Sequence, residues 1–202
     1  MSISLKSLLA AAVASLVVGN AMAADGTINF TGEISAASCN ITGGAGTTVG
    51  GEKGNQTINV NLGKVSIDAL GGTAGSGIAG GTNINLNLDC GNTGTGLTTV
   101  MLKFDPRSGS GLDTNNVSLL KTTGTASGVG IGIYDVNGKL LNLSANETFD
   151  ADLIATTTGE GADAKTTYSA KLDLRAGYVK SGSAAPKAGT ANGTLPFTLT
   201  YN

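Results

Sequence analysis

Residues 168–178 read YSAKLDLRAGY, and their apolar side chains recur at every second position. Because successive side chains of a strand point to opposite faces, this spacing predicts a β-strand with one face in a core and the other in solvent. Shorter segments with the same alternation are residues 28–34, 84–90, 100–104, 129–133 and 195–201. Half-buried strands of this kind are typical of antiparallel sheets, so we predict an all-β fold.

Turn-forming residues separate these segments. The pair Asn137-Gly138 lies between two short apolar segments and is a strong hairpin signal. Glycine-rich stretches at residues 43–51 and 71–81, and residues 181–193 before the last segment, predict loops. About six or seven short strands with such turns, together with two cysteines, predict one antiparallel β-sandwich of the immunoglobulin type.

The composition excludes several classes of protein. Of the 202 residues, 40% are hydrophobic and only 13% are charged, which excludes a highly charged disordered chain. The net charge is −2 without any basic run, so we do not expect nucleic acid as a partner. The chain has no histidine, which excludes a Ser-His-Asp triad and removes the commonest metal ligand among the side chains.

The remaining candidates for chemistry are weak. Asp150, Asp152 and Asp163 could supply a pair of catalytic carboxylates, but a solvated surface explains them better. The glycines of residues 128–132 resemble the beginning of a dinucleotide fingerprint, yet no helix is predicted after them. Asp113 begins a short run of oxygen-bearing side chains without the rest of a calcium loop. We therefore predict no catalytic residue, no metal site and no cofactor, and we do not expect an enzyme.

Residues 1–23 have the pattern of an export signal. Lys6 precedes an apolar stretch at residues 8–18, which is too short to cross a bilayer. The small residues Ala21 and Ala23 follow, so cleavage is predicted after Ala23. A buried N-terminal helix is the alternative interpretation of this stretch.

Export changes the interpretation of Cys39 and Cys90, the two cysteines of the chain. In an oxidising compartment an isolated pair is expected to form a structural disulfide. Because the pair closes a long loop, the chain-entropy description assigns it about 4 kcal/mol of stability. A metal site needs more ligands, and redox-active cysteines need a C-x-x-C spacing that this chain lacks.

Both ends of the predicted exported chain have strand character. Residues 195–202 form the last predicted strand with no strand after it, whereas a seven-stranded sandwich would continue. Residues 24–34 alternate apolar side chains directly after the predicted cleavage site. One end therefore indicates a sandwich that lacks a strand, and the other indicates a strand to spare.

Several motifs together resemble one known family. Residues 26–34 (GTINFTGEI) are followed by a short spacer and Cys39, residues 128–135 read GVGIGIYD, Tyr201 is the penultimate residue and Gly189 is fourteenth from the end. On these motifs the whole exported chain resembles pilin subunits of the chaperone–usher type, and above all the type 1 fimbrial subunits of Gram-negative bacteria.

The resemblance implies an incomplete immunoglobulin-like antiparallel β-sandwich that lacks its seventh strand and exposes a hydrophobic groove between its first and last strands. A periplasmic chaperone would fill the groove with a lent strand, and at the outer-membrane usher the N-terminal extension of the next subunit would replace that strand. The implied layout is a signal peptide at residues 1–23, a donor-strand extension with the start of the first strand at 24–38, and a pilin domain at 39–202.

The family's functional residues map onto the two ends of this sequence. The donor strand is implied to present a face formed by Gly26, Ile28, Phe30, Gly32 and Ile34. The acceptor groove and chaperone-binding edge are implied to comprise Gly189, Leu195, Phe197, Leu199 and Tyr201. Two simpler interpretations stay open, namely that residues 28–34 are the protein's own first strand and that the C-terminal apolar residues are ordinary core.

Length and the weakly charged, glycine-rich composition favour the major shaft subunit of a fimbrium used in cell adhesion, with identical or related pilin subunits as partners at the cell surface. A minor or adaptor fimbrial subunit is one alternative. A soluble secreted β-sandwich that binds carbohydrate is the alternative from another class of protein.

Overall fold

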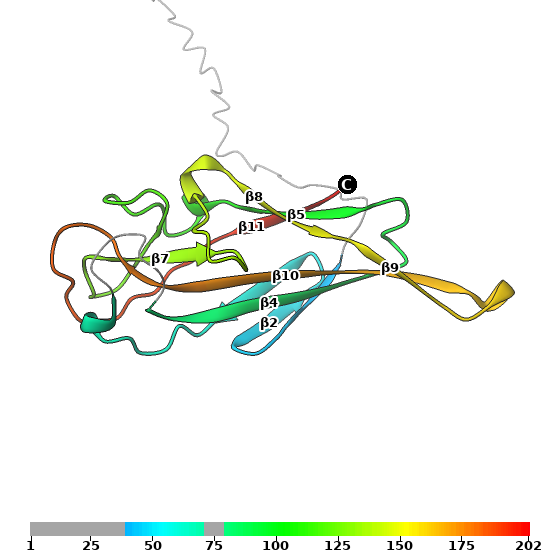
Figure 1. Ribbon diagram of the computed structural model, residues 1–202, viewed down its shortest axis with the longest axis horizontal. Helices are drawn as coiled ribbons and strands as arrows, with labels where there is room; N and C mark the ends of the chain where they lie inside the picture. Colours follow the sequence, from blue (N-terminus) through cyan, green and yellow to red (C-terminus); the bar gives the residue numbers. More distant parts are fainter. Residues whose placement is uncertain (1–38, 71–78) are drawn as a thin grey trace, which may run out of the picture. The chain divides into compact units, whose positions relative to one another are not determined.

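The computed structural model describes residues 39–70 and 79–202. The predicted signal peptide, the predicted donor segment and most of the glycine-rich stretch 71–81 lie outside the described residues. The described residues form eleven strands, joined by turns and four short 3-10 helices, and contain no α-helix (Figure 1). Accordingly, no helix in this part of the chain is long and apolar enough to cross a membrane.

The larger sheet is antiparallel and is built around the long strand β10 (Lys165–Lys180). On one side β10 pairs with β4 (Ala79–Gly91), which pairs in turn with β1 (Asn40–Gly43). On the other side β10 pairs with β7 (Val129–Tyr134), and β7 pairs with β6 (Leu120–Lys121). The longest predicted strand is therefore confirmed and lies at the centre of the sheet.

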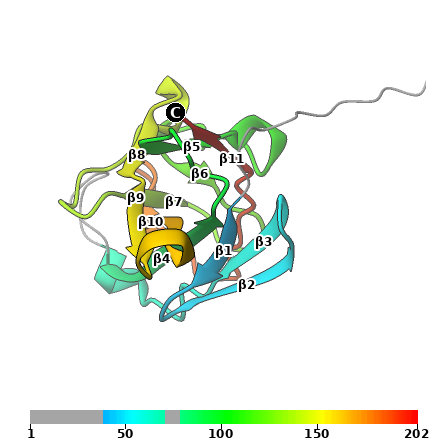
Figure 2. The same cartoon turned by 90° about the vertical axis from the view of Figure 1, so that its right-hand side faces the viewer.

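The smaller sheet is also antiparallel and has the order β11 (Phe197–Tyr201), β5 (Thr99–Phe104) and β8 (Thr148–Asp152). Its inner side chains meet those of the larger sheet in one apolar core, where Leu102 of β5 and Leu172 of β10 are 1% and 0% exposed. The two sheets form the layers of a sandwich, as Figure 2 shows. The predicted all-β, immunoglobulin-like class is thus confirmed.

A two-stranded hairpin joins β2 (Thr47–Glu52) to β3 (Asn55–Val60). The prediction of a loop at residues 43–51 was therefore wrong. Val49 and Ile58 are register partners in this hairpin, and both lie half-buried against the core, which anchors one face of the hairpin. Among the glycines that suggested a loop, Gly46 and Gly51 have positive φ values of 82° and 91° near the two ends of β2, a conformation that favours glycine.

The turn predicted at Asn137-Gly138 is confirmed, with a φ of 78° at the glycine. Across the turn, the main-chain N–H of Leu141 donates to the carbonyl oxygen of Ile133 at 2.8 Å. The second arm forms only an isolated bridge to β7, because the chain then enters the 3-10 helix η3 (Leu143–Ala145).

β9 (Ile154–Thr158) pairs with the first residues of β10, and η4 (Gly161–Asp163) lies at the tip of this hairpin. The hairpin extends beyond the end of the sandwich in Figure 1, and all five residues of β9 are exposed. The two other 3-10 helices are η1 (Ile67–Leu70) and η2 (Pro106–Ser108). Residues 181–193 contain no strand, as predicted.

Candidate strand-acceptor site

β11 is the outermost strand of its sheet in the described part of the chain, because it pairs with β5 on one side only. Just beyond its end, Asn202 and Thr99 exchange two main-chain hydrogen bonds of 2.9 and 3.0 Å. In an antiparallel ladder such pairs alternate with pairs whose main-chain groups point away from each other. The main-chain groups of Phe197, Leu199 and Tyr201 therefore point away from β5, toward the outer edge.

The same edge carries apolar side chains on its inner face. The residues that pack against the core there while staying only partly buried are Leu195, Phe197, Leu199 and Tyr201. One strand further in, Val100 and Leu102 of β5 are 0% and 1% exposed. The inner side chains of β11 are thus less buried than those of β5. The outer strand therefore offers both main-chain groups and apolar surface to a further strand.

Tyr201 connects this edge to the beginning of β1. Its hydroxyl oxygen accepts a hydrogen bond from the main-chain N–H of Cys39 at 3.4 Å. Burial raises the pKa of the Tyr201 hydroxyl above its ordinary value, and the bond from Cys39 opposes this shift. Cys39 forms the predicted disulfide with Cys90, so the covalent link between the start of β1 and the end of β4 lies beside this tyrosine.

Gly189 lies outside β11, in the segment that leads to it. A Cβ atom at this position would lie 2.4 Å from the main-chain nitrogen of Ala126 and 2.6 Å from the carbonyl carbon of Thr125. Isolated antiparallel bridges join the two segments at Thr123 with Asn192 and at Ser127 with Lys187. Glycine is therefore required here by a close crossing of two chain segments, and a part in strand acceptance stays a prediction.

The predicted donor face lies outside the described residues; it comprises Gly26, Ile28, Phe30, Gly32 and Ile34. Its pairing with another subunit stays a prediction. Sequence motifs did not single out Gln56 of β3, whose side chain forms two hydrogen bonds with the main chain of Ile41 in β1. No sequence signal marks this contact, since it depends on how the β2–β3 hairpin packs beside β1.

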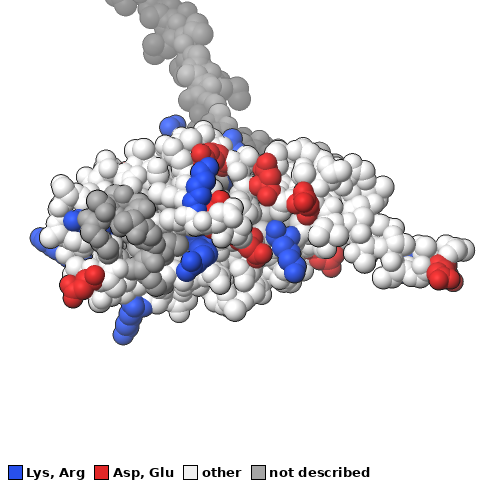
Figure 3. All heavy atoms as spheres, in the orientation of Figure 1, with Lys and Arg blue, Asp and Glu red and all other residues white. Residues whose placement is uncertain are grey.

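The weak chemical candidates lie on the surface or in regular structure. Asp150 and Asp152 are exposed on β8, and Asp163 is exposed in η4. The glycines of residues 128–132 belong mainly to strand β7. On the face seen in Figure 3, acidic and basic side chains are interspersed and form no large patch of one sign.

Asp113 is buried, but its carboxylate stabilises a turn. Its Oδ1 accepts hydrogen bonds from the main-chain N–H groups of Asn115 and Asn116 at 2.9 and 3.0 Å. Across residues 39–70 and 79–202, no three ligand-type side chains come together in a way that could hold a metal ion.

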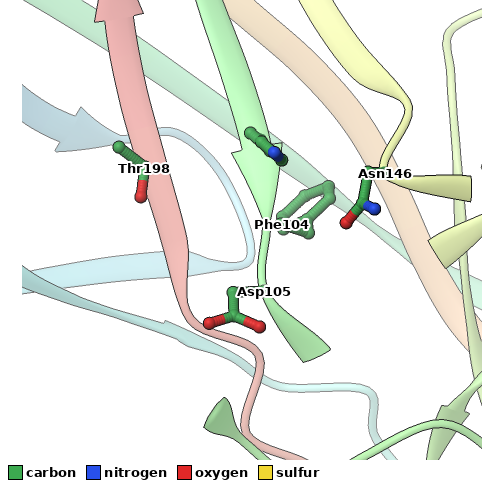
Figure 4. A pocket seen from close by; sticks show the side chains of 5 residues that line it. Phe104, Asp105, Asn146 and Thr198 are labelled. Atoms are coloured by element: carbon green, nitrogen blue, oxygen red, sulfur yellow. The ribbon is translucent and has the colours of Figure 1, made fainter. Parts of the chain in front are cut away.

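A hollow of about 310 Å³ lies where β5 ends (Figure 4). The residues that line it are exposed except for Phe104, which is partly buried; they are Lys103, Phe104, Asp105, Asn146 and Thr198. The carboxylate of Asp105 accepts a hydrogen bond from the hydroxyl of Ser108, which lowers the pKa of Asp105. The hollow is thus an open, polar part of the surface beside a capped turn.

The comparisons with known proteins identify the family of this chain. A family model described as "Fimbrial protein" matches residues 28–202. The chain belongs to this family. A curated relative of this fimbrial subunit, the "Type-1 fimbrial protein subunit" of Serratia marcescens, is 34% identical over 196 residues, which is 96% of each chain.

Two solved structures are also similar to this fimbrial subunit. A structure of a chaperone–usher pilus, described as revealing the molecular basis of rod uncoiling, matches with a TM-score of 0.50 and 18% identity over 88% of this chain and 95% of its own. The P pilus rod subunit PapA matches with a TM-score of 0.48 and 22% identity over 87% and 100%. The first of these similarities supports the fold alone.

Proposed function

We propose that this fimbrial subunit builds the shaft of a type 1-like fimbrium by strand exchange between copies of the chain. Residues 24–34 of one copy add to the outer edge of β11 in another. The observation that carries the proposal is that Phe197, Leu199 and Tyr201 combine outward main-chain groups with partly exposed apolar side chains.

A single added strand would bind the outward main-chain groups of this edge and cover its apolar side chains. Its main-chain groups would pair with those of β11, and every second side chain would cover the apolar inner face. Covering apolar surface stabilises the assembly by about 25 cal/mol per Å². The alternation in residues 26–34, with Ile28 and Phe30 as the bulky members, has the spacing that this role requires.

Before assembly, the same edge would be held by a periplasmic chaperone and released at an outer-membrane usher. The export pattern of residues 1–23 supports passage through the periplasm. The disulfide Cys39–Cys90 supports the same route, because such bonds persist in oxidising compartments. The chain would then act structurally at the cell surface, with related or identical subunits as partners and without enzymatic activity, cofactor or metal.

A displacement experiment tests this proposal. The chaperone-bound subunit is mixed with a synthetic peptide of residues 24–38, with a peptide of the same composition in scrambled order as the control. We expect the native peptide alone to displace the chaperone and form a one-to-one complex, measured by native mass spectrometry.

The other outcomes identify the alternatives. A subunit that accepts extensions of related subunits but not its own would be a minor or adaptor subunit. A chain that stays a stable monomer without any partner and binds glycans would be a soluble carbohydrate-binding sandwich. Either result would refute the self-polymerising shaft.

A further inference from the structure

The side chain of Gln56 in β3 binds the main chain of Ile41 in β1 through two hydrogen bonds. The N–H of Ile41 donates to Oε1 of Gln56 at 2.8 Å, and Nε2 of Gln56 donates to the carbonyl oxygen of Ile41 at 3.0 Å. Nε2 also lies 3.4 Å from Oδ1 of Asn40. The primary amide thus matches one donor and one acceptor of the same residue, as a peptide group of a neighbouring strand would.

The direction of these bonds places Gln56 on the outer edge of β1. Ile41 is the register partner of Leu88 in the antiparallel pair of β1 and β4. Both main-chain groups of a residue in such a ladder point to the same side. Because those of Ile41 are bound by Gln56, they point away from β4, and the amide occupies the position of a further strand.

The β2–β3 hairpin holds Gln56 in this position. Gln56, Ile58 and Val60 are the partly buried residues of β3 and alternate with exposed ones. Ile58 and Val60 pack against the core, so apolar burial fixes the hairpin beside β1 and places the amide at its edge. The bond is therefore supported by packing that does not involve the amide itself.

The next outward group of this edge is also bound by a side chain. The N–H of Cys39, two residues before Ile41, donates to the hydroxyl oxygen of Tyr201. The β1 edge is thus bound at Cys39 by the last strand and at Ile41 by the hairpin. β11 differs, because the main-chain groups of Phe197 and Leu199 on its outer edge have no such partner within the described residues.

We infer that Gln56 is a positioning residue that closes the outer edge of β1 to strand addition at Ile41. At this level of the sandwich, the extension of a second copy of this chain therefore pairs with β11 alone. The inference rests on the proposed strand exchange. An open sheet edge accepts strands in alternative registers and favours aggregation. Closing one of two edges leaves the apolar pattern of the other to determine the register.

Three variants test this role. Gln56→Leu removes both hydrogen bonds while keeping a side chain of similar size. Gln56→Glu keeps an acceptor for the N–H of Ile41, but when ionised it places a carboxylate oxygen against the carbonyl of Ile41. Asn59→Leu is the control, because Asn59 is an exposed residue of the same strand.

The first measurement is amide hydrogen exchange at Ile41 in the chaperone-bound subunit. We expect Gln56→Leu to speed this exchange about tenfold, which corresponds to about 1.4 kcal/mol, and Asn59→Leu to leave it unchanged. In Gln56→Glu, the ionised carboxylate repels the carbonyl oxygen of Ile41, so protection of the Ile41 amide should be lower than in the wild type at neutral pH. This protection should return below about pH 4, where the protonated carboxyl donates to the carbonyl of Ile41. Loss of packing alone would not reverse with pH.

The second measurement counts the peptides of residues 24–38 bound by each variant, using native mass spectrometry. We expect one peptide on the wild type and on Asn59→Leu, and complexes with two peptides on Gln56→Leu. Unchanged exchange at Ile41, an exchange in Gln56→Glu that does not respond to pH, or one peptide on every variant would overturn the inference. If no variant binds the peptide while the exchange at Ile41 still differs, strand exchange fails and the closed β1 edge stands only as a stabilising contact.

Discussion

The disulfide Cys39–Cys90 is expected to supply about 4 kcal/mol of the stability of the subunit. The two cysteines are 51 positions apart in the sequence. For a loop of about this length, the chain-entropy relation gives about 14 cal/mol/K, or about 4 kcal/mol at 25 °C. The double variant Cys39→Ala/Cys90→Ala should lose at least this amount, because both side chains are also buried, at 3% and 0% exposure.

Urea unfolding of the subunit bound to the peptide of residues 24–38 measures this loss. The oxidised wild type, the reduced wild type and the double variant are compared, because the reduced wild type keeps both sulfur atoms and isolates the effect of the cross-link. We also expect less chaperone-bound subunit in cells, since Cys39 holds the start of β1 beside Tyr201. A difference below about 1 kcal/mol between oxidised and reduced wild type would refute the entropic reasoning.

The remaining predictions concern the two ends of the chain. Phe197→Asp places a charge on the inner face of β11 and should abolish accumulation of the subunit in the periplasm, whereas Thr198→Asp on the exposed face should not. Equal accumulation of the two variants on immunoblots would contradict the acceptor edge. Gly32→Leu in the peptide of residues 24–38 should weaken displacement of the chaperone about 5- to 150-fold, which corresponds to overpacking by 1–3 kcal/mol. Equal displacement by the wild-type and Gly32→Leu peptides would show that Gly32 has no part in the mechanism. Burial raises the pKa of Tyr201, so its neutral hydroxyl stabilises the fold below about pH 10 and this contribution is lost as the pH rises through the raised pKa. Tyr201→Phe should therefore lose less stability than the wild type between about pH 10 and 12 in urea titrations, and equal losses would show that this ionisation is not linked to folding.

Strand positions could be predicted wherever one face of a strand meets the core and the other meets solvent. Residues 168–178 lie within β10, and residues 84–90 lie within β4. In both segments the apolar residues alternate with polar ones, so the period of two is visible in the sequence itself. The disulfide was predictable for another reason, because two cysteines in an exported chain allow only one intramolecular pairing.

The burial of the outer face of β7 could not be predicted from the alternation of its residues. The pattern of residues 129–133 indicates one apolar face, yet every residue of β7 is buried. A Cβ atom on Gly130 would lie 2.9 Å from Cβ of Leu119, and one on Gly132 would lie 2.7 Å from the ring of Tyr134. The glycines are therefore needed because side chains from elsewhere cover this face, which is a consequence of tertiary packing.

The β2–β3 hairpin was missed because its glycines resemble a loop, and its contribution to the β1 edge is purely tertiary. Val49 and Ile58 are the apolar residues that anchor it, but they stand near glycine and asparagine residues, which are depleted in strands. The partner of Gln56 is a main-chain group, which carries no residue-specific signal in the sequence. Contacts of a side chain with a distant main chain can therefore be found only from the structure.

The two edges differ in what can satisfy them. A side-chain amide presents one acceptor and paired donors, which is enough for one outward residue of β1, Ile41. The outer edge of β11 presents Phe197, Leu199 and Tyr201, whose main-chain groups are spread along the strand and are joined by partly exposed apolar side chains. No single side chain can span this length and also cover the apolar face. An added strand does both, and for this reason we expect assembly to act through β11 while the hairpin keeps β1 closed.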